Sequence, residues 1–187
     1  MVFAQKVIAP GPGARNLIML AYIGIGSNLG DKPGNCRRAI EALGSDPRNR
    51  LVRCSPLYYT EPVGKTDQDW FVNGVVSLET SMDPRGVLEF LLSIERKMGR
   101  VREEKWGPRT IDLDILFCGD QILNENDLQV PHPRLHERRF VLIPLQDVAP
   151  DLVHPVLGKA VSRILAELDT RERVIPLQEG NEKACTV

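Results

Sequence analysis

The hydrophobic pattern of the chain predicts strands interleaved with helices. A short β-type run at 21–25 stops at a Gly-Ser-Asn turn (26–28) and leads into a helical stretch at about 31–43. Two further runs, 51–59 and 71–80, are rich in β-branched and aromatic residues and are typical of strands. The loop between these two strands is too long for a tight hairpin. The first half of the pattern therefore predicts a strand, a helix and two more strands.

The second half of the pattern adds one helix and one strand. Asp83 and Pro84 supply an N-cap and a first helical position, and Gly99 closes an apolar face with 3.6-residue spacing, which predicts a helix over 83–98. Residues 110–117 then alternate between apolar and acidic positions, as a strand does. The order β-α-β-β-α-β predicts an α+β fold with a ferredoxin-like core, in which helices pack on an antiparallel sheet.

The remaining sequence predicts an extension of the same domain. A Pro-rich region contains an apolar run at 140–145 and a short helix at about 159–168. With 187 residues, of which 42% are hydrophobic and 26% charged, the chain has the composition of one globular domain. We therefore expect a single domain over 20–170 with a C-terminal extension, a loose N-terminal segment (1–19) and a tail (171–187).

Composition excludes several classes of partner. Lys and Arg total 24 against 25 Asp and Glu, so no global charge attracts the chain to nucleic acid or to an anionic membrane. No apolar run approaches the ~18 residues of a membrane span, and the Pro-Gly-Pro-Gly run at 10–13 interrupts what would be a signal peptide. The four cysteines form no CxxC pair, and the three histidines do not share a helical face, which argues against zinc. We expect a cytoplasmic protein with reduced thiols.

Two carboxylates on the strand at 110–117 give the strongest chemical signal. Asp112 and Asp114 project from the same face, with Cα atoms about 6.6 Å apart. Their charges repel, and a divalent cation would relieve the repulsion. Hard oxygen ligands that leave most coordination positions open suit Mg²⁺ shared with phosphate oxygens. The alternative is an acidic pair on a solvent-facing strand, which is common and needs no metal.

A cationic stretch lies directly before these acids. Residues 96–109 contain six basic and two acidic residues, a net charge of +4 in a chain whose total is −1. The forked guanidiniums of Arg100, Arg102 and Arg109 are suited to neutralise a polyphosphate beside a two-carboxylate metal site. Glycines flank Trp106 in this stretch, which indicates a lid that excludes water when it closes. The alternative is a solvated loop whose charges pair locally.

Two segments of the sequence are similar to known phosphate-binding motifs but do not match them. Residues 64–66 imitate the end of a P-loop, but Tyr59 stands where that motif needs glycine, and residues 24–30 are one residue too long for the dinucleotide fingerprint. A nucleotide would therefore be held by arginines and metal. His132 and the arginines that follow it, Arg138 among them, either add to a phosphate pocket or form an ordinary exposed basic turn.

Several runs of the chain together resemble one family, the 6-hydroxymethyl-7,8-dihydropterin pyrophosphokinases of folate biosynthesis. The run Lys-Trp-Gly-Pro-Arg-Thr-Ile-Asp-Leu-Asp-Ile-Leu at 105–116 is similar to the family signature throughout. The other similar runs are 22–31, 59–64, 71–73, Glu95 with 99–102, 130–133 and 138–140. The resemblance covers residues 20 to 160.

The resemblance implies transfer of pyrophosphate from ATP to the hydroxymethyl group of the pterin, with release of AMP, in tetrahydrofolate biosynthesis. The implied partners are ATP, 6-hydroxymethyl-7,8-dihydropterin and other enzymes of the folate pathway. Two Mg²⁺ ions would be held by Asp112 and Asp114, while Arg100 and Arg109 would act catalytically on charge that develops during transfer. The implied ATP-binding residues are Leu88, Glu95, Arg102, Trp106, Ile115, His132 and Arg138.

The same resemblance implies a slot for the flat pterin between two aromatic rings, Phe71 and Phe140. Thr60 and Asn73 would hydrogen-bond the edge of the heterocycle, because a flat, polar-edged ring needs stacking together with directional donors and acceptors. The backbone of Val63, with Gly64, would assist. The alternative for Phe71 is ordinary packing at the start of a strand.

The chain departs from the usual family pattern at three positions. Glu61 stands where the family often has proline, Lys105 where arginine is frequent, and Pro133 where a tyrosine can occur. Two rival functions are disfavoured. A nucleotidyltransferase would place its acids some ten residues after the Gly-Ser turn, but Asp112 follows Ser27 by 85 residues. A ferredoxin-like RNA-binding module would need an RNP-type aromatic string, which is missing from the sequence.

Overall fold

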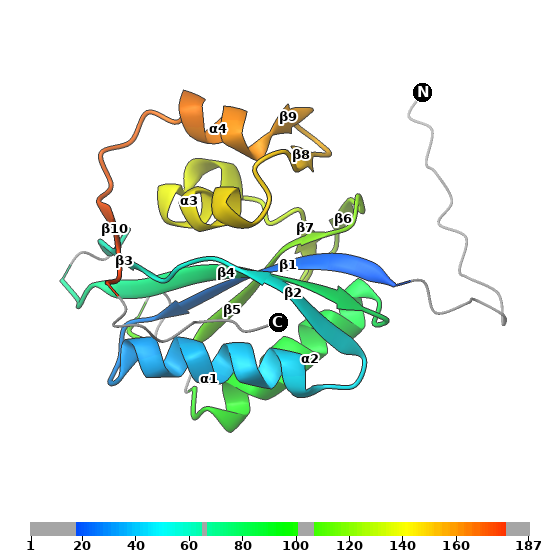
Figure 1. The fold of residues 1–187 in the computed structure, drawn as a ribbon, viewed down its shortest axis with the longest axis horizontal. Coiled ribbons are helices and arrows are strands. Elements are labelled where there is room, and N and C mark those ends of the chain that lie inside the picture. The colour runs from blue at the N-terminus through cyan, green and yellow to red at the C-terminus, as the bar shows by residue number, and fades with distance from the viewer. Residues whose placement is uncertain (1–17, 65–66, 101–106, 179–187) are drawn as a thin grey trace, which may run out of the picture.

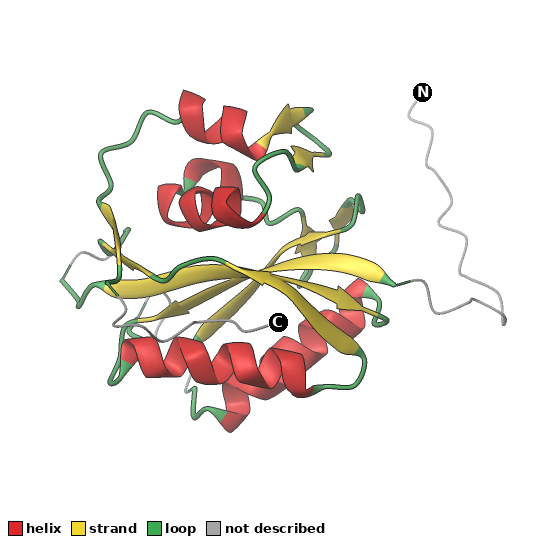
Figure 2. Ribbon diagram, viewed as in Figure 1, coloured by secondary structure: helices red, strands yellow, loops and turns green. Residues whose placement is uncertain are grey.

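The computed structural model describes residues 18–64, 67–100 and 107–178, and shows one antiparallel sheet with helices on both faces (Figures 1 and 2). Helices α1 and α2 cover one face of the sheet, and α3 and α4 lie over the other. The elements are β1 (Met19–Ser27), α1 (Lys32–Ser45), β2 (Asn49–Cys54), β3 (Tyr58–Thr60), β4 (Phe71–Thr80), α2 (Pro84–Lys97), β5 (Asp112–Cys118), β6 (Leu123–Asn124), β7 (Gln129–Val130), the 3₁₀ turn η1 (Leu135–Glu137), α3 (Arg139–Val148), β8 (Val153–His154), β9 (Lys159–Ala160), α4 (Val161–Glu167) and β10 (Val174–Pro176).

The sheet runs in the order β10-β3-β4-β1-β5, with β2 also paired to β4. Every pairing in it is antiparallel. The predicted α+β class, with helices packed on an antiparallel sheet, is confirmed. Helix α2 begins as predicted, because the Asp83 side chain accepts a hydrogen bond from the Gly86 N–H at 2.8 Å.

Two predicted boundaries were wrong. The first strand continues through Gly26 and Ser27, which the sequence assigned to a turn, because both residues pair with the neighbouring strand β4. The strand expected at 51–59 is divided into β2 and β3. Pro56 cannot donate to a strand ladder, and beside it the Ser55 hydroxyl accepts the Val75 N–H at 3.0 Å.

The C-terminal third packs on the second face of the sheet. The apolar run at 140–145 lies within α3, and the short helix expected at 159–168 is α4. Residues 174–176, within the segment expected to be a tail, form β10 and pair with β3. Among the residues described, no helix has the length and apolarity needed to cross a membrane.

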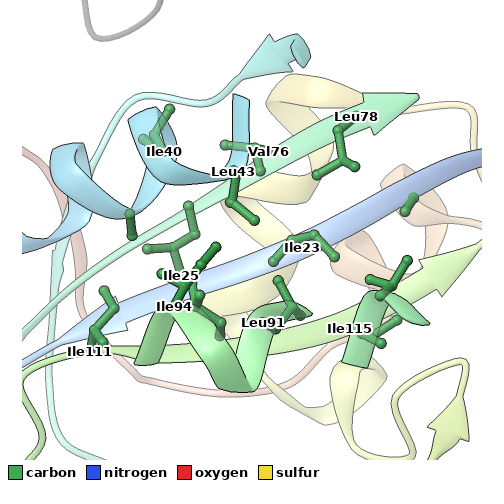
Figure 3. Close-up of a cluster of buried hydrophobic side chains, with 14 of the residues drawn as sticks. Ile23, Ile25, Ile40, Leu43, Val76, Leu78, Leu91, Ile94, Ile111 and Ile115 are labelled. Carbon is green, nitrogen blue, oxygen red and sulfur yellow. The ribbon is translucent and has the colours of Figure 1, made fainter. Parts of the chain in front are cut away.

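Two hydrophobic cores result, one on each face of the sheet. Ile23 and Ile25 of β1 pack with Leu43 of α1 and Leu91 of α2 in the larger core (Figure 3). Tyr22 belongs instead to the second core, which α3 and α4 cover. Because side chains alternate along a strand, the two glycines that alternate with these isoleucines face the α3 side, where they leave room over the sheet.

Candidate active site

A cavity of about 650 Å³ lies over β1, β4 and β5. Gly24 and Gly26 form part of its floor. A Cβ atom at Gly26 would stand 2.6 Å from Oδ1 of Asn73, its partner in the β1–β4 register, and one at Gly24 would touch Leu116 at 3.4 Å. The missing side chains therefore keep this part of the sheet open to a ligand.

Most of the residues expected at the site line this one cavity. They are Thr60, Val63, Phe71, Asn73, Leu88, Glu95, Arg100, Arg109, Asp112, Asp114, His132, Arg138 and Phe140. Ile115 instead lines an adjoining cavity of about 290 Å³, which shares Leu88, Asp114 and His132 with the first. Gly64 does not appear in either lining. Arg102 and Trp106, with most of the expected lid, lie outside the described residues.

The acidic pair is surrounded by guanidinium groups. Asp112 forms ion pairs with Arg100, at 2.6 Å to Oδ1, and with Arg109 through Oδ2. Asp114 has Arg138 at 3.9 Å. Desolvation and the neighbouring charge of Asp112 both raise the pKa of Asp114 above its ordinary value. The two carboxylates thus repel each other, as their positions on one strand face predict.

Glu95 holds this arrangement together from helix α2. Its side chain is buried, and its Oε1 accepts the Leu113 N–H at 2.8 Å and also pairs with Arg100. One carboxylate therefore connects the helix, the strand that carries the two aspartates and an arginine of the cationic stretch. Such a connection fixes Arg100 beside Asp112.

The donor set fits a magnesium ion. Asp112 and Asp114 offer hard carboxylate oxygens, and the Asp114 side chain is 45% exposed. Among the described residues no group of three or more His, Cys, Asp and Glu side chains could hold a metal. A cation bound to the two aspartates would therefore take its remaining ligands from phosphate oxygens or water. Because guanidiniums contact both Asp112 oxygens, a cation there would have to share or displace them.

Asn28 is a buried residue of the site that the sequence analysis read only as a turn. Its N–H donates to the Arg109 carbonyl at 3.1 Å, and its Oδ1 accepts the Arg109 N–H at 2.7 Å. Its Nδ2 donates to Oε1 of Gln68 at 3.0 Å, on the loop between β3 and β4. The only signal for this role was the position of Asn28 inside the run at 22–31, because the contacts lie 81 and 40 residues away along the chain.

Strands β3 and β4, which β1 separates from β5, carry most of the residues expected to receive the pterin. The Asn73 amide donates to the Thr60 hydroxyl at 2.6 Å across β3 and β4. Phe71 and Phe140 both line the cavity, and the Arg138 guanidinium stands 5.7 Å from the centre of the Phe140 ring. Polar groups and aromatic rings therefore line the cavity together.

His132 lies between the cationic groups and strand β5. Its N–H donates to the Leu116 carbonyl at 3.0 Å, and its Nδ1 accepts the Arg134 N–H at 3.1 Å. Burial and the nearby Arg138 charge lower the pKa of His132 to about 4. The ring is therefore neutral at physiological pH.

Comparison with known proteins agrees with this geometry. The family model described as 7,8-dihydro-6-hydroxymethylpterin-pyrophosphokinase (HPPK) matches residues 22–150. The 2-amino-4-hydroxy-6-hydroxymethyldihydropteridine pyrophosphokinase of Methylorubrum extorquens is 49% identical over 150 residues, 80% of this chain and 93% of that protein. The enzyme of the same name from Pseudomonas aeruginosa is 45% identical over 150 residues, 80% of this chain and 92% of that protein.

Solved structures agree at the level of the fold. The Plasmodium falciparum HPPK-DHPS wild type with pteroate superposes with a TM-score of 0.67 at 16% identity, over 83% of this chain and 43% of that chain. The chain thus spans less than half the length of the Plasmodium proteins that it matches. From the family model and the relatives at 45–49% identity, the chain belongs to the 7,8-dihydro-6-hydroxymethylpterin-pyrophosphokinase family.

Proposed function

We propose that this chain transfers pyrophosphate from ATP to the hydroxymethyl oxygen of 6-hydroxymethyl-7,8-dihydropterin, in the biosynthesis of folate. Membership of the family supports the reaction. The observation that carries the assignment of the site is one cavity lined both by the carboxylates of β5 with their guanidinium partners and by aromatic, amide and hydroxyl groups of β3 and β4, which strand β1 separates from β5. This arrangement suits a polyphosphate and a flat heterocycle held side by side.

The transfer makes one bond and breaks one. The pterin hydroxymethyl oxygen attacks the β-phosphorus of ATP, the bond from that phosphorus to the α–β bridging oxygen breaks, and AMP leaves with that oxygen. The hydroxyl proton is released. Two reactants held in one cavity react as if in a single molecule, so positioning supplies much of the rate enhancement.

At the nucleotide end, Asp112 and Asp114 would hold two Mg²⁺ ions. Bound there, the ions would neutralise charge on the phosphates and align them. Arg100 and Arg109 face the same position and would stabilise the negative charge that moves onto the departing AMP. Glu95 orients Arg100 through their ion pair.

Other groups would fix the nucleotide itself. His132 and Arg138 would contact phosphate oxygens, with His132 as a neutral ring. Leu88 and Ile115 line the adjoining cavity and would receive the adenine, where shape matters more than charge. The expected roles of Arg102 and Trp106 in ATP binding stay predictions from the sequence.

At the pterin end, Phe71 and Phe140 would stack on the two faces of the ring. Asn73 and Thr60 would exchange their mutual hydrogen bond, in part, for bonds to the pterin edge. The Val63 backbone and Gly64 would complete that edge. Each of these groups would contact the heterocycle rather than the phosphates. Their substitution should therefore weaken pterin binding more than ATP binding.

We also propose that residues 20–170 form one catalytic domain, to whose sheet strand β10 is added. A cytoplasmic location fits an enzyme that consumes ATP and carries the buried thiols Cys36 and Cys118. The Plasmodium neighbours carry the name HPPK-DHPS. Association of this chain with another folate enzyme stays a prediction, which co-purification of the two enzymes would check.

Product analysis tests the proposed reaction. The protein is incubated with ATP, Mg²⁺ and 6-hydroxymethyl-7,8-dihydropterin, and the products are followed by phosphorus NMR. We expect AMP and a pterin diphosphate in equal amounts. Formation of ADP with a pterin monophosphate would contradict attack at the β-phosphorus, and release of free pyrophosphate would contradict transfer to the pterin.

A further inference from the structure

The loop between β3 and β4 is bound at both of its ends by one arginine of the C-terminal strand segment. Arg173, which directly precedes β10, donates from its backbone N–H to Oε2 of Glu61 at 3.0 Å and from Nε to Oε1 of Glu61 at 2.6 Å. Its guanidinium also stands 4.8 Å from the centre of the Trp70 ring. Glu61 is the first residue of this loop and Trp70 is the last.

Those two loop residues are direct neighbours of residues expected to bind the pterin. Glu61 follows Thr60, the last residue of β3, and Trp70 precedes Phe71, the first residue of β4. Thr60 and Phe71 are register partners in the β3–β4 pairing. A contact that holds Glu61 and Trp70 in place therefore also restrains Thr60 and Phe71, because a single peptide bond joins each of them to its neighbour.

Strand β10 fixes the position of the arginine. Val174 pairs with Thr60 in the sheet, and the Leu177 N–H donates to the Leu57 carbonyl at 2.8 Å. The Glu61 N–H also reaches the Arg173 carbonyl at 3.4 Å. The guanidinium is thus carried by a segment that already pairs with β3, beside the end of β3 that it binds, so the contact needs little additional ordering.

The residue before Arg173, Glu172, lies beside the first residue of α3. Burial raises the pKa of the Glu172 carboxyl, and a hydrogen bond from the Arg139 backbone N–H opposes this rise. Arg139 precedes Phe140, the second ring expected to stack on the pterin. Two consecutive residues therefore contact the segments that carry Phe71 and Phe140.

We propose that Arg173 is a positioning residue for the pterin: by clamping Glu61 to Trp70 it holds Thr60 and Phe71 in the arrangement that receives the ring. This inference rests on the proposed function. It assigns a part in substrate recognition to the C-terminal segment, which lies outside the 22–150 match to the family model.

Steady-state kinetics of Arg173→Ala test the proposal. An exposed ion pair together with a cation–π contact predicts a KM for the pterin that rises about five- to twentyfold. The KM for ATP stays within about twofold and kcat within about threefold, because the nucleotide end keeps its contacts. Arg173→Lys should lose less pterin affinity than Arg173→Ala, since lysine keeps the positive charge but lacks the planar, forked guanidinium group.

Two further variants separate positioning from general stability. Arg163→Ala is the matched control, because Arg163 is an exposed arginine on α4 that pairs with Glu167, and it should leave both KM values unchanged. Glu61→Gln should raise the pterin KM as Arg173→Ala does, and the double variant should add little to either single change.

Three outcomes would overturn the proposal. They are an unchanged pterin KM in Arg173→Ala, a parallel rise of both KM values, and full additivity with Glu61→Gln. A lower melting temperature with unchanged pterin KM would show a structural role only. Failure of the proposed function is distinguishable, because then the wild-type protein would form no AMP with the pterin.

Discussion

Asn28 and Arg109 exchange two hydrogen bonds, although they lie 81 residues apart in the chain. The pair attaches the segment that leads into Asp112 to the residue that follows strand β1. The remaining amide donor of Asn28 bonds Gln68, which lines the cavity from the β3–β4 loop. One buried amide thus connects the backbone of Arg109, which we propose to be catalytic, with the β3–β4 loop.

We predict that Asn28→Ala lowers kcat/KM about 10- to 100-fold, because the Arg109 N–H loses its acceptor, Oδ1 of Asn28, and only the backbone bond between the two residues remains. Gln68→Ala removes only the third hydrogen bond and should cost about fivefold or less. Both variants are measured by initial rates under subsaturating pterin. Equal losses in the two variants would contradict a role for the side-chain bond from Asn28 to Arg109.

Arg109→Ala should lower turnover far more than ATP affinity. The guanidinium pairs with Asp112, where the proposed mechanism places the developing charge, so kcat should fall about 100- to 1000-fold while the Kd for ATP changes less than about tenfold. Calorimetric titration with a non-hydrolysable ATP analogue measures the affinity. The control is Arg50→Ala, which breaks an exposed pair with Glu79 and should keep normal turnover. A loss confined to ATP binding would disprove the transition-state role.

Asp114→Asn should separate activity from stability. Its nearest cationic partner, Arg138, stands 3.9 Å away and its neighbour Asp112 repels it, so removal of the charge should leave the free energy of unfolding unchanged or raise it by about 1 kcal/mol. Turnover should fall by about 1000-fold or more, because the proposed Mg²⁺ site exchanges a negatively charged carboxylate for a neutral amide.

Thermal unfolding without ATP and product formation over a range of Mg²⁺ concentrations check this variant. Asp120→Asn, an exposed aspartate beyond the other end of β5, is its control and should match the wild type in both measurements. Near-normal turnover of Asp114→Asn at ordinary Mg²⁺ would remove the metal assignment. A clear loss of stability would mean that the carboxylate is a structural partner instead.

His132 should make the protein less stable as the pH falls. Its pKa lies at about 4 in the folded state, below the ordinary 6.5, so between these values the unfolded chain takes up a proton that the folded protein does not. The stability is present above pH 6.5 and is lost as the pH falls toward 4. The wild type should lose about 1–3 kcal/mol more than His132→Gln over this range. Parallel curves in urea titrations at several pH values would contradict the burial of a neutral ring.

The larger part of the fold was accessible from sequence periodicity. Strand β4 is marked by an apolar run, and helix α2 by an apolar stripe and an N-cap followed by proline. In both elements the tertiary contacts agree with these local signals. Strand β1 ran past its predicted end, because pairing with β4 on one side and β5 on the other satisfies the backbone of Gly26. A turn signal depends on neighbouring residues only. It therefore does not predict pairing with residues that are distant in the chain.

The sequence by itself determined the α+β class and placed Asp112 and Asp114 on one face, because two residues that are two positions apart on a strand must share a face. The tertiary structure decided which distant groups meet that face. The Asn28 contact to Arg109 and the Arg173 clamp on Glu61 join residues that lie 81 and 112 positions apart along the chain. Side-chain periodicity is a local property, whereas these contacts exist only once the sheet has brought its strands together.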